Sequence, residues 1–73
     1  KTDIIINLKN LSSMNSWELG MIISALRAVK EANGRLRLSH LNSTIEALFE
    51  LTALDKIVEV YPTEAEALQS LTS

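Results

Sequence analysis

The sequence predicts an α/β fold in which three strand–helix units form a mainly parallel sheet with helices packed on it. An isoleucine-rich run precedes a long amphipathic segment, and two further short apolar runs are each followed by a polar turn and a helical period. Strands that alternate with helices in this way run parallel through right-handed crossovers. Three strands would leave both sheet edges open, so we expect more sheet from residues missing here or from another chain, and self-association through the edges is one outcome.

Length and composition limit the classes of function. The 73 residues form one small domain, and the chain has no cysteine for a disulfide or a cysteine–zinc site. The net charge of −2 includes no basic block, which argues against nucleic acid as the main partner. No apolar run is long enough to insert into a membrane, so a cytoplasmic domain is expected. The chain begins at Lys1 without an initiator methionine, which suggests a fragment, a processed product or part of a longer domain.

The first unit should consist of a buried strand over Thr2–Leu8 and a helix that starts near Ser16 or Trp17 and ends near Ala32. The Ser16 hydroxyl is expected to cap the helix, and Gly34 is suited to the left-handed position after its end. The predicted apolar stripe of this helix comprises Leu19, Ile22, Ile23, Leu26 and Val29.

The second and third units follow the same plan. Arg35–Ser39 alternates and predicts a strand with one wetter face, towards a sheet edge. Asn42 or Ser43 should cap the second helix, Ile57–Tyr61 should form the third strand, and Thr63–Glu66 fits a capping box for the last helix. The residues expected to face inward from these helices and their ends are Ile45, Leu48, Phe49, Leu51, Leu54, Ala67, Leu68 and Leu71.

No catalytic constellation is present in the sequence. His40 is the sole histidine and has no second ligand for a metal, so a loop position without catalytic duty is expected. Glu64 and Glu66 fall in a first helical turn, where negative charge is stabilising without any chemistry. Gly20 and Gly34 do not form a phosphate-binding loop. We therefore expect no enzyme, metal or cofactor, and a nucleotide-binding or catalytic α/β domain is the weaker alternative.

Four segments follow one another along nearly the whole chain, and they are Leu11–Gly20, Asn33–Leu38, Glu50–Ile57 and Tyr61–Leu68. In this order they resemble landmarks of STAS domains, the family of sulfate transporters and anti-sigma-factor antagonists. The first segment resembles the family's signature turn, in which a hydrophobic residue precedes Asp-Ser-Ser-Gly-Leu-Gly. The second resembles the Gly-Gly-x-Leu-x-Leu strand entry, the third the Leu-Thr-Gly-Leu-Asp segment, and the fourth the ending of many members. The chain thus resembles the C-terminal two-thirds of such a domain, which implies that it lacks the N-terminal strands.

The resemblance implies a binding switch. Bacterial members of the family bind an anti-sigma factor, often a serine kinase, and phosphorylation of the first signature serine blocks that binding. Ser16 aligns with this serine, so it is a candidate phosphorylation site, although it could serve only as the helix cap. Asn15, Trp17 and Glu18 replace the family's Asp, second Ser and first Gly. Glu18 would add a fixed negative charge beside a phosphate, and Trp17 would either anchor a partner or fold back onto the core.

The predicted partner-binding surface therefore centres on the signature turn and the exposed face of the first helix. Its residues are Asn15, Ser16, Trp17, Glu18, Gly20, Arg27, Lys30 and Glu31. The family also contains regulatory modules of larger transporters and sensors that have no phosphoswitch, and such a module is the alternative function.

Overall fold

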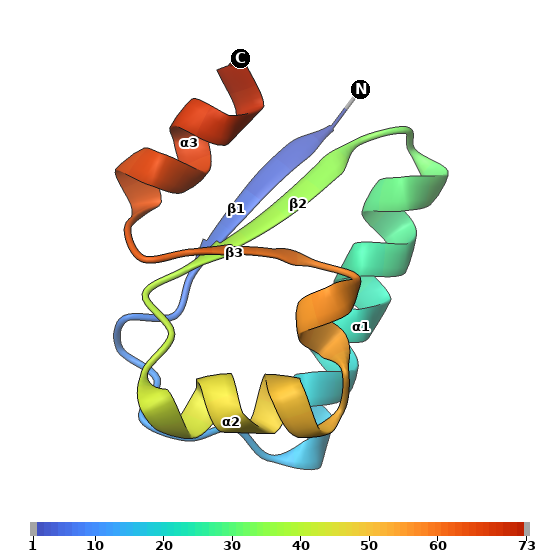
Figure 1. The fold of residues 1–73 in the computed structure, drawn as a ribbon. Helices are drawn as coiled ribbons and strands as arrows, with labels where there is room; N and C mark the ends of the chain where they lie inside the picture. Colours follow the sequence, from blue (N-terminus) through green and yellow to red (C-terminus); the bar gives the residue numbers. More distant parts are fainter. Residues whose placement is uncertain (1, 73) are drawn as a thin grey trace.

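The computed structural model describes residues 2–72 as alternating strands and helices (Figure 1). The elements are β1 (Asp3–Asn7), α1 (Ser16–Glu31), β2 (Arg35–Ser39), α2 (Ser43–Leu51), the 3₁₀-helix η1 (Leu54–Lys56), β3 (Glu59–Tyr61) and α3 (Glu64–Thr72). This order confirms the predicted α/β class.

The three strands form one parallel sheet in the order β1-β2-β3. Asp3 of β1 lies opposite Arg35 of β2, and Leu38 of β2 lies opposite Val60 of β3. The prediction that β2 lies towards an edge was wrong, because β2 is the central strand. Its alternation of leucine and arginine distinguishes two covered faces of the sheet rather than one covered face and one wet face.

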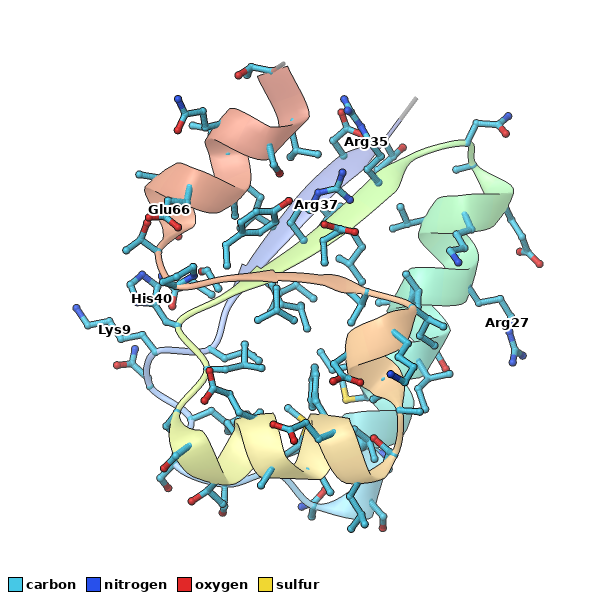
Figure 2. All side chains as sticks on the ribbon, viewed as in Figure 1. Lys9, Arg27, Arg35, Arg37, His40 and Glu66 are labelled. Carbon is cyan, nitrogen blue, oxygen red and sulfur yellow. The ribbon has the colours of Figure 1, made fainter. Side chains whose placement is uncertain are left out.

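The arginine side of β2 lies under α3. Arg35 Nη2 donates to the backbone oxygen of Leu71 at 2.9 Å, and Arg37 Nε donates to Ser70 Oγ at 3.1 Å. Arg35 also forms an ion pair with Asp3 at 3.0 Å, which links β2 to β1. Figure 2 shows both guanidinium groups in the space between the sheet and α3. The arginines therefore hold the last helix on the sheet.

The leucine side of β2 faces the main core, which is covered by α1 and α2 (Figure 1). Leu38 and Ile45 have no exposed surface, and the Phe49 ring is 1% exposed. The buried apolar residues of this core are Leu8, Ile22, Leu26, Val29, Leu36, Leu38, Ile45, Phe49, Leu54 and Val58. Because α3 packs on the other face, the sheet lies between two helical layers.

Strand β1 is an edge strand and is less buried than the sequence predicted. Asp3, Ile4 and Asn7 are exposed, and Ile5 and Ile6 are half-buried. The prediction of a buried strand was wrong because β1 pairs with β2 on one side only and α1 packs on β2. A contiguous run of isoleucines shows that a strand could be covered, but it does not supply the element that covers it.

Gly34 is required for a reason other than the predicted one. The left-handed residue after α1 is Asn33, with φ of 59°, and Gly34 has no positive φ. A Cβ atom on Gly34 would lie 1.6 Å from the backbone oxygen of Thr2. Glycine is therefore needed because the start of β1 passes directly over this position.

The helix caps and apolar stripes agree with the prediction in part. Asn42 caps α2, and Thr63 Oγ accepts a hydrogen bond from the Glu66 N–H at 3.1 Å. Leu51 and Leu68, however, are 85% and 55% exposed and do not close over the core. Leu51 is the last residue of α2 and lies beyond its buried stripe. In α3 the buried residue is Ala67, and Leu68, one position further round the helix, faces outward.

Candidate protein-binding surface at the first turn of α1

The loop between β1 and α1 leaves the carboxyl end of the sheet, where parallel α/β folds usually bind ligands and partners. The Leu8 N–H donates to the Ser39 oxygen at 2.9 Å, and the Leu11 N–H donates back to the Leu8 oxygen at 3.0 Å. Leu8 is buried, whereas Ser12 and Ser13 are exposed. The loop is thus fixed at its base and open at its tip.

Asn15, and not Ser16, caps α1. Asn15 Oδ1 accepts a hydrogen bond from the Glu18 N–H at 2.8 Å, and Glu18 Oε1 accepts one from the Asn15 N–H at 2.9 Å. These reciprocal bonds form a capping box. The prediction that Ser16 caps the helix was wrong by one residue, because asparagine in extended conformation takes the cap and Ser16 becomes the first helical residue.

The Ser16 hydroxyl therefore takes no part in capping α1. Its side chain is exposed, and within residues 2–72 its hydroxyl has no hydrogen-bond partner. The first turn of the helix also carries unpaired backbone N–H groups that favour a negative charge. A phosphate on Ser16 would lie next to these groups, in the same helical turn as the Glu18 carboxylate.

A side chain outside the predicted set holds the loop in place. Asn42, the cap of α2, donates from Nδ2 to the backbone oxygens of Leu11 and Ser12 at 3.2 and 2.9 Å. Its Oδ1 accepts the Ile45 N–H at 2.8 Å. The sequence identified Asn42 only as a cap. The signal for its second role was its place just after β2, because loops that follow neighbouring parallel strands meet at the same sheet edge.

Trp17 projects from the first turn into solvent. Its side chain is 72% exposed, and Met21, one turn further along the same face, is also exposed. Both residues border a shallow groove of about 560 Å³, which Ser16, Gly20 and Ser24 complete. The alternative in which Trp17 folds back onto the core is therefore wrong.

Because Gly20 has no side chain, the surface of α1 beside Trp17 stays open. A Cβ atom placed there would meet nothing within 4 Å, so no contact among residues 2–72 requires glycine. Glycine inside a helix costs about 1 kcal/mol relative to alanine. The open space beside Trp17 is therefore maintained at the expense of stability.

A second apolar groove of about 360 Å³ runs along the other side of Trp17, between α1 and β1. Its lining includes Ile6, Leu11, Met14 and Ala25. Trp17 and Met21 form the ridge between the two grooves. The first turn of α1 thus presents an aromatic ridge between two largely apolar grooves, one of which is also bordered by Ser16 and Ser24.

The structure separates the remaining predicted residues from this turn. Arg27, Lys30 and Glu31 lie about three to four turns further along α1, roughly 16–22 Å from Ser16 at 1.5 Å per residue. They border a different groove, of about 380 Å³, with Ile23, Leu26 and Ile57. The predicted binding surface is therefore two surfaces on one helix.

His40 has a structural contact. Its Nε2 accepts a hydrogen bond from the Glu64 N–H at 3.3 Å, and its backbone has a φ of 60°. In the part of the chain that the structure describes, no three His, Cys, Asp or Glu side chains lie where they could hold a metal. Among the same residues, no helix is both long and apolar enough to cross a membrane.

Comparison with known proteins identifies relatives of the chain. The model of the STAS domain family matches residues 1–67. The anti-sigma F factor antagonist of Paenibacillus polymyxa is 31% identical over 68 residues, which are 93% of this chain and 58% of that protein. The anti-sigma-B factor antagonist of Bacillus subtilis is 34% identical over 58 residues, 80% of this chain and 53% of that protein.

A solved structure supports the same relationship. The crystal structure of an anti-sigma factor antagonist from Thermotoga maritima superposes with a TM-score of 0.93 at 31% identity, covering 96% of this chain and 60% of that one. The chain spans about three fifths of the length of the curated relatives it matches.

Proposed function

This chain belongs to the STAS domain family, and we propose that it acts as an anti-sigma factor antagonist that binds an anti-sigma factor through the first turn of α1. The binding surface would consist of Ser16, Trp17 and Gly20, and the capping box of Asn15 and Glu18 would hold the turn in its conformation. Such a protein works in the cytoplasm, where sigma factors act. The anti-sigma partner would be a serine kinase if it follows the pattern of the family.

The exposed Trp17 ridge beside an unpartnered Ser16 hydroxyl is the observation that supports the proposal most strongly. Large exposed aromatic side chains supply much of the binding free energy at protein interfaces. Trp17 is 72% exposed and borders grooves on both sides, so a partner could surround it. No other residue of the predicted surface offers as much apolar area.

Ser16 is the proposed point of control. A phosphate on its exposed hydroxyl would add about −1.5 to −2 charges to the surface at neutral pH. The Glu18 carboxylate already takes part in the capping box, so the phosphate would add to an existing negative charge. We expect this combined charge to weaken binding of a partner that must contact Trp17.

The proposal is tested by titrating the full-length protein into the purified anti-sigma factor of the same organism in a calorimeter. The wild type and Ser16→Ala should bind, and Ser16→Asp should bind at least tenfold more weakly. Trp17→Ala should also lose at least tenfold in affinity, about 1.4 kcal/mol. Leu68→Ala is a matched control, because Leu68 is an exposed apolar residue on α3, away from the site.

The outcomes separate the surface from the switch. If Trp17→Ala loses binding while all Ser16 variants bind with equal affinity, the proposed binding surface is supported and control through Ser16 is refuted. Equal affinities for wild type, Trp17→Ala and Leu68→Ala would refute the surface. Absence of binding by the wild type would refute antagonism and leave the regulatory-module function.

A further inference from the structure

The groove at the C-terminal half of α1 lies apart from the proposed anti-sigma site and has an apolar floor. It measures about 380 Å³ and is bounded by α1 on one side and by Ile57, the residue just after η1, on the other. Ile57 is 52% exposed and Ile23 is 37% exposed. Leu26 lies beneath them in the core. Two isoleucines therefore leave apolar surface in a hollow that the described chain does not fill.

The rim of this groove carries positive charge that is not neutralised. Arg27 and Lys30 are exposed, and the one ion pair among residues 2–72 is formed by Arg35 and Asp3. Figure 2 shows the Arg27 side chain extending away from α1. Glu31 is the one acidic residue of the lining. The groove is thus suited to an aliphatic side chain flanked by carboxylates.

The chain itself displays such a group at the end of α2. Leu51 is 85% exposed, the highest value among its exposed large apolar residues. Glu50 precedes it and Glu46 lies one turn earlier, and both are exposed. Neither glutamate is in an ion pair within the described part of the chain. Burial of a leucine side chain stabilises by about 1.5–3 kcal/mol, so this exposure leaves binding free energy unused.

The protruding leucine and the groove lie on neighbouring segments. Helix α2 ends at Leu51, packs against η1, and η1 leads directly to Ile57 on the groove wall. A two-fold axis beside these segments would let each of two copies insert its own leucine into the groove of the other. An interface of this kind is closed and uses the same surface on both copies.

We propose that this chain forms a two-fold dimer in which Leu51 of each copy fills the groove between Ile23 and Ile57 of the other. In this dimer Glu46 and Glu50 face Arg27 and Lys30 across the interface. This dimer does not use the proposed anti-sigma site at the first turn of α1. It also differs from association through the sheet edges, because β1 and β3 stay unpaired on their outer sides. One leucine and two charged pairs per half form a small contact, so we expect a weak dimer.

Sedimentation equilibrium of the full chain at several concentrations and at low salt tests the proposal. Leu51→Ser should raise the dissociation constant at least tenfold, whereas Leu68→Ser, an exposed leucine on α3, should leave it unchanged. Arg27→Glu should also weaken the dimer at least tenfold. The double variant Arg27→Glu with Glu50→Arg should recover most of the loss, which a merely structural effect would not do. Circular dichroism should show that all variants are folded.

Four results would overturn the dimer. A wild-type chain that remains monomeric at several hundred micromolar excludes it. A dimer unaffected by Leu51→Ser, or equally weakened by Leu68→Ser, places the contact elsewhere, and the open sheet edges would then be the interface. Failure of the charge swap to recover affinity removes the proposed pairing. If the chain is monomeric and Arg27→Glu lowers its affinity for the anti-sigma factor, the groove binds that partner and not a second copy.

Discussion

The loops that follow β1 and β2 both end in an asparagine whose side chain caps the next helix. Each leaves the carboxyl end of a parallel strand and starts a helix with an asparagine cap, Asn15 or Asn42. Asn15 Oδ1 accepts the Glu18 N–H and Asn42 Oδ1 accepts the Ile45 N–H, both at 2.8 Å. By their caps alone the two helix starts are equivalent.

The residues after the cap make the two helix starts different. The third helical position is Glu18 in α1 and the fully buried Ile45 in α2. Asn42 also donates to two carbonyls of the neighbouring loop, whereas the side-chain bond of Asn15 stays within its own turn. The same kind of cap therefore starts one helix whose first turn reaches the core through Ile45 and one whose first turn, Ser16 to Glu18, does not.

Asn42→Ala should have the largest effect, because it removes a cap and two bonds between loops. We expect the free energy of unfolding to fall by about 2–3 kcal/mol, from about 1 kcal/mol for the cap and a similar amount for each lost bond. Urea denaturation followed by circular dichroism measures this. Asn42→Asp keeps the acceptor and loses the donor, so it should cost less. If Asn42→Ala costs no more than Asn15→Ala, the contrast between the two loops is wrong.

Asn15→Ala should cost about 1 kcal/mol in the same urea experiment, because only the local capping box is lost. Asn15→Asp is its control and should retain most of the stability, since a carboxylate also accepts the Glu18 N–H. A loss of 3 kcal/mol or more would show that the first turn of α1 is tied to the core after all.

Gly20→Ala gives α1 the residue that α2 has five positions after its own cap, Ala47. Because nothing lies within 4 Å of the added carbon, we expect a gain in stability of about 0.5–1 kcal/mol. Calorimetric titration should show weaker binding to the anti-sigma factor if the partner uses the space beside Trp17. Unchanged affinity together with a gain in stability would exclude Gly20 from the binding surface.

Local patterns predicted much of the fold. The apolar period and the residues that stop helices gave the bounds of α1 to within a residue, and the strand β2 agreed at both ends. Three-residue β3 was predicted two residues too long at its start. The exposure of β1 and the central place of β2 depend on which strands pair across the sheet. Those pairings join residues more than 20 positions apart, and a single strand's pattern carries no information about them.

The candidate site was predicted less completely than the fold. Ser16, Trp17 and Gly20 lie together as expected, while Arg27 and Lys30 lie in a separate groove because three turns of helix intervene. The second role of Asn42 depends on a contact between residues 30 and 31 positions apart. Such a contact follows only from the parallel register of β1 and β2.

The strand order has a consequence for the protein during its synthesis. Each strand pairs with the one made just before it, so β1 and β2 can form their complete register before β3 exists. At about 5–20 residues per second, the residues from His40 to the end of α2 at Leu51 take roughly 0.6–2 s to make. During that interval the leucine face of β2 lacks α2, the helix that contributes Ile45 and Phe49 to its cover. Until α2 is complete, the leucine face of β2 is therefore open to chaperones and to aggregation.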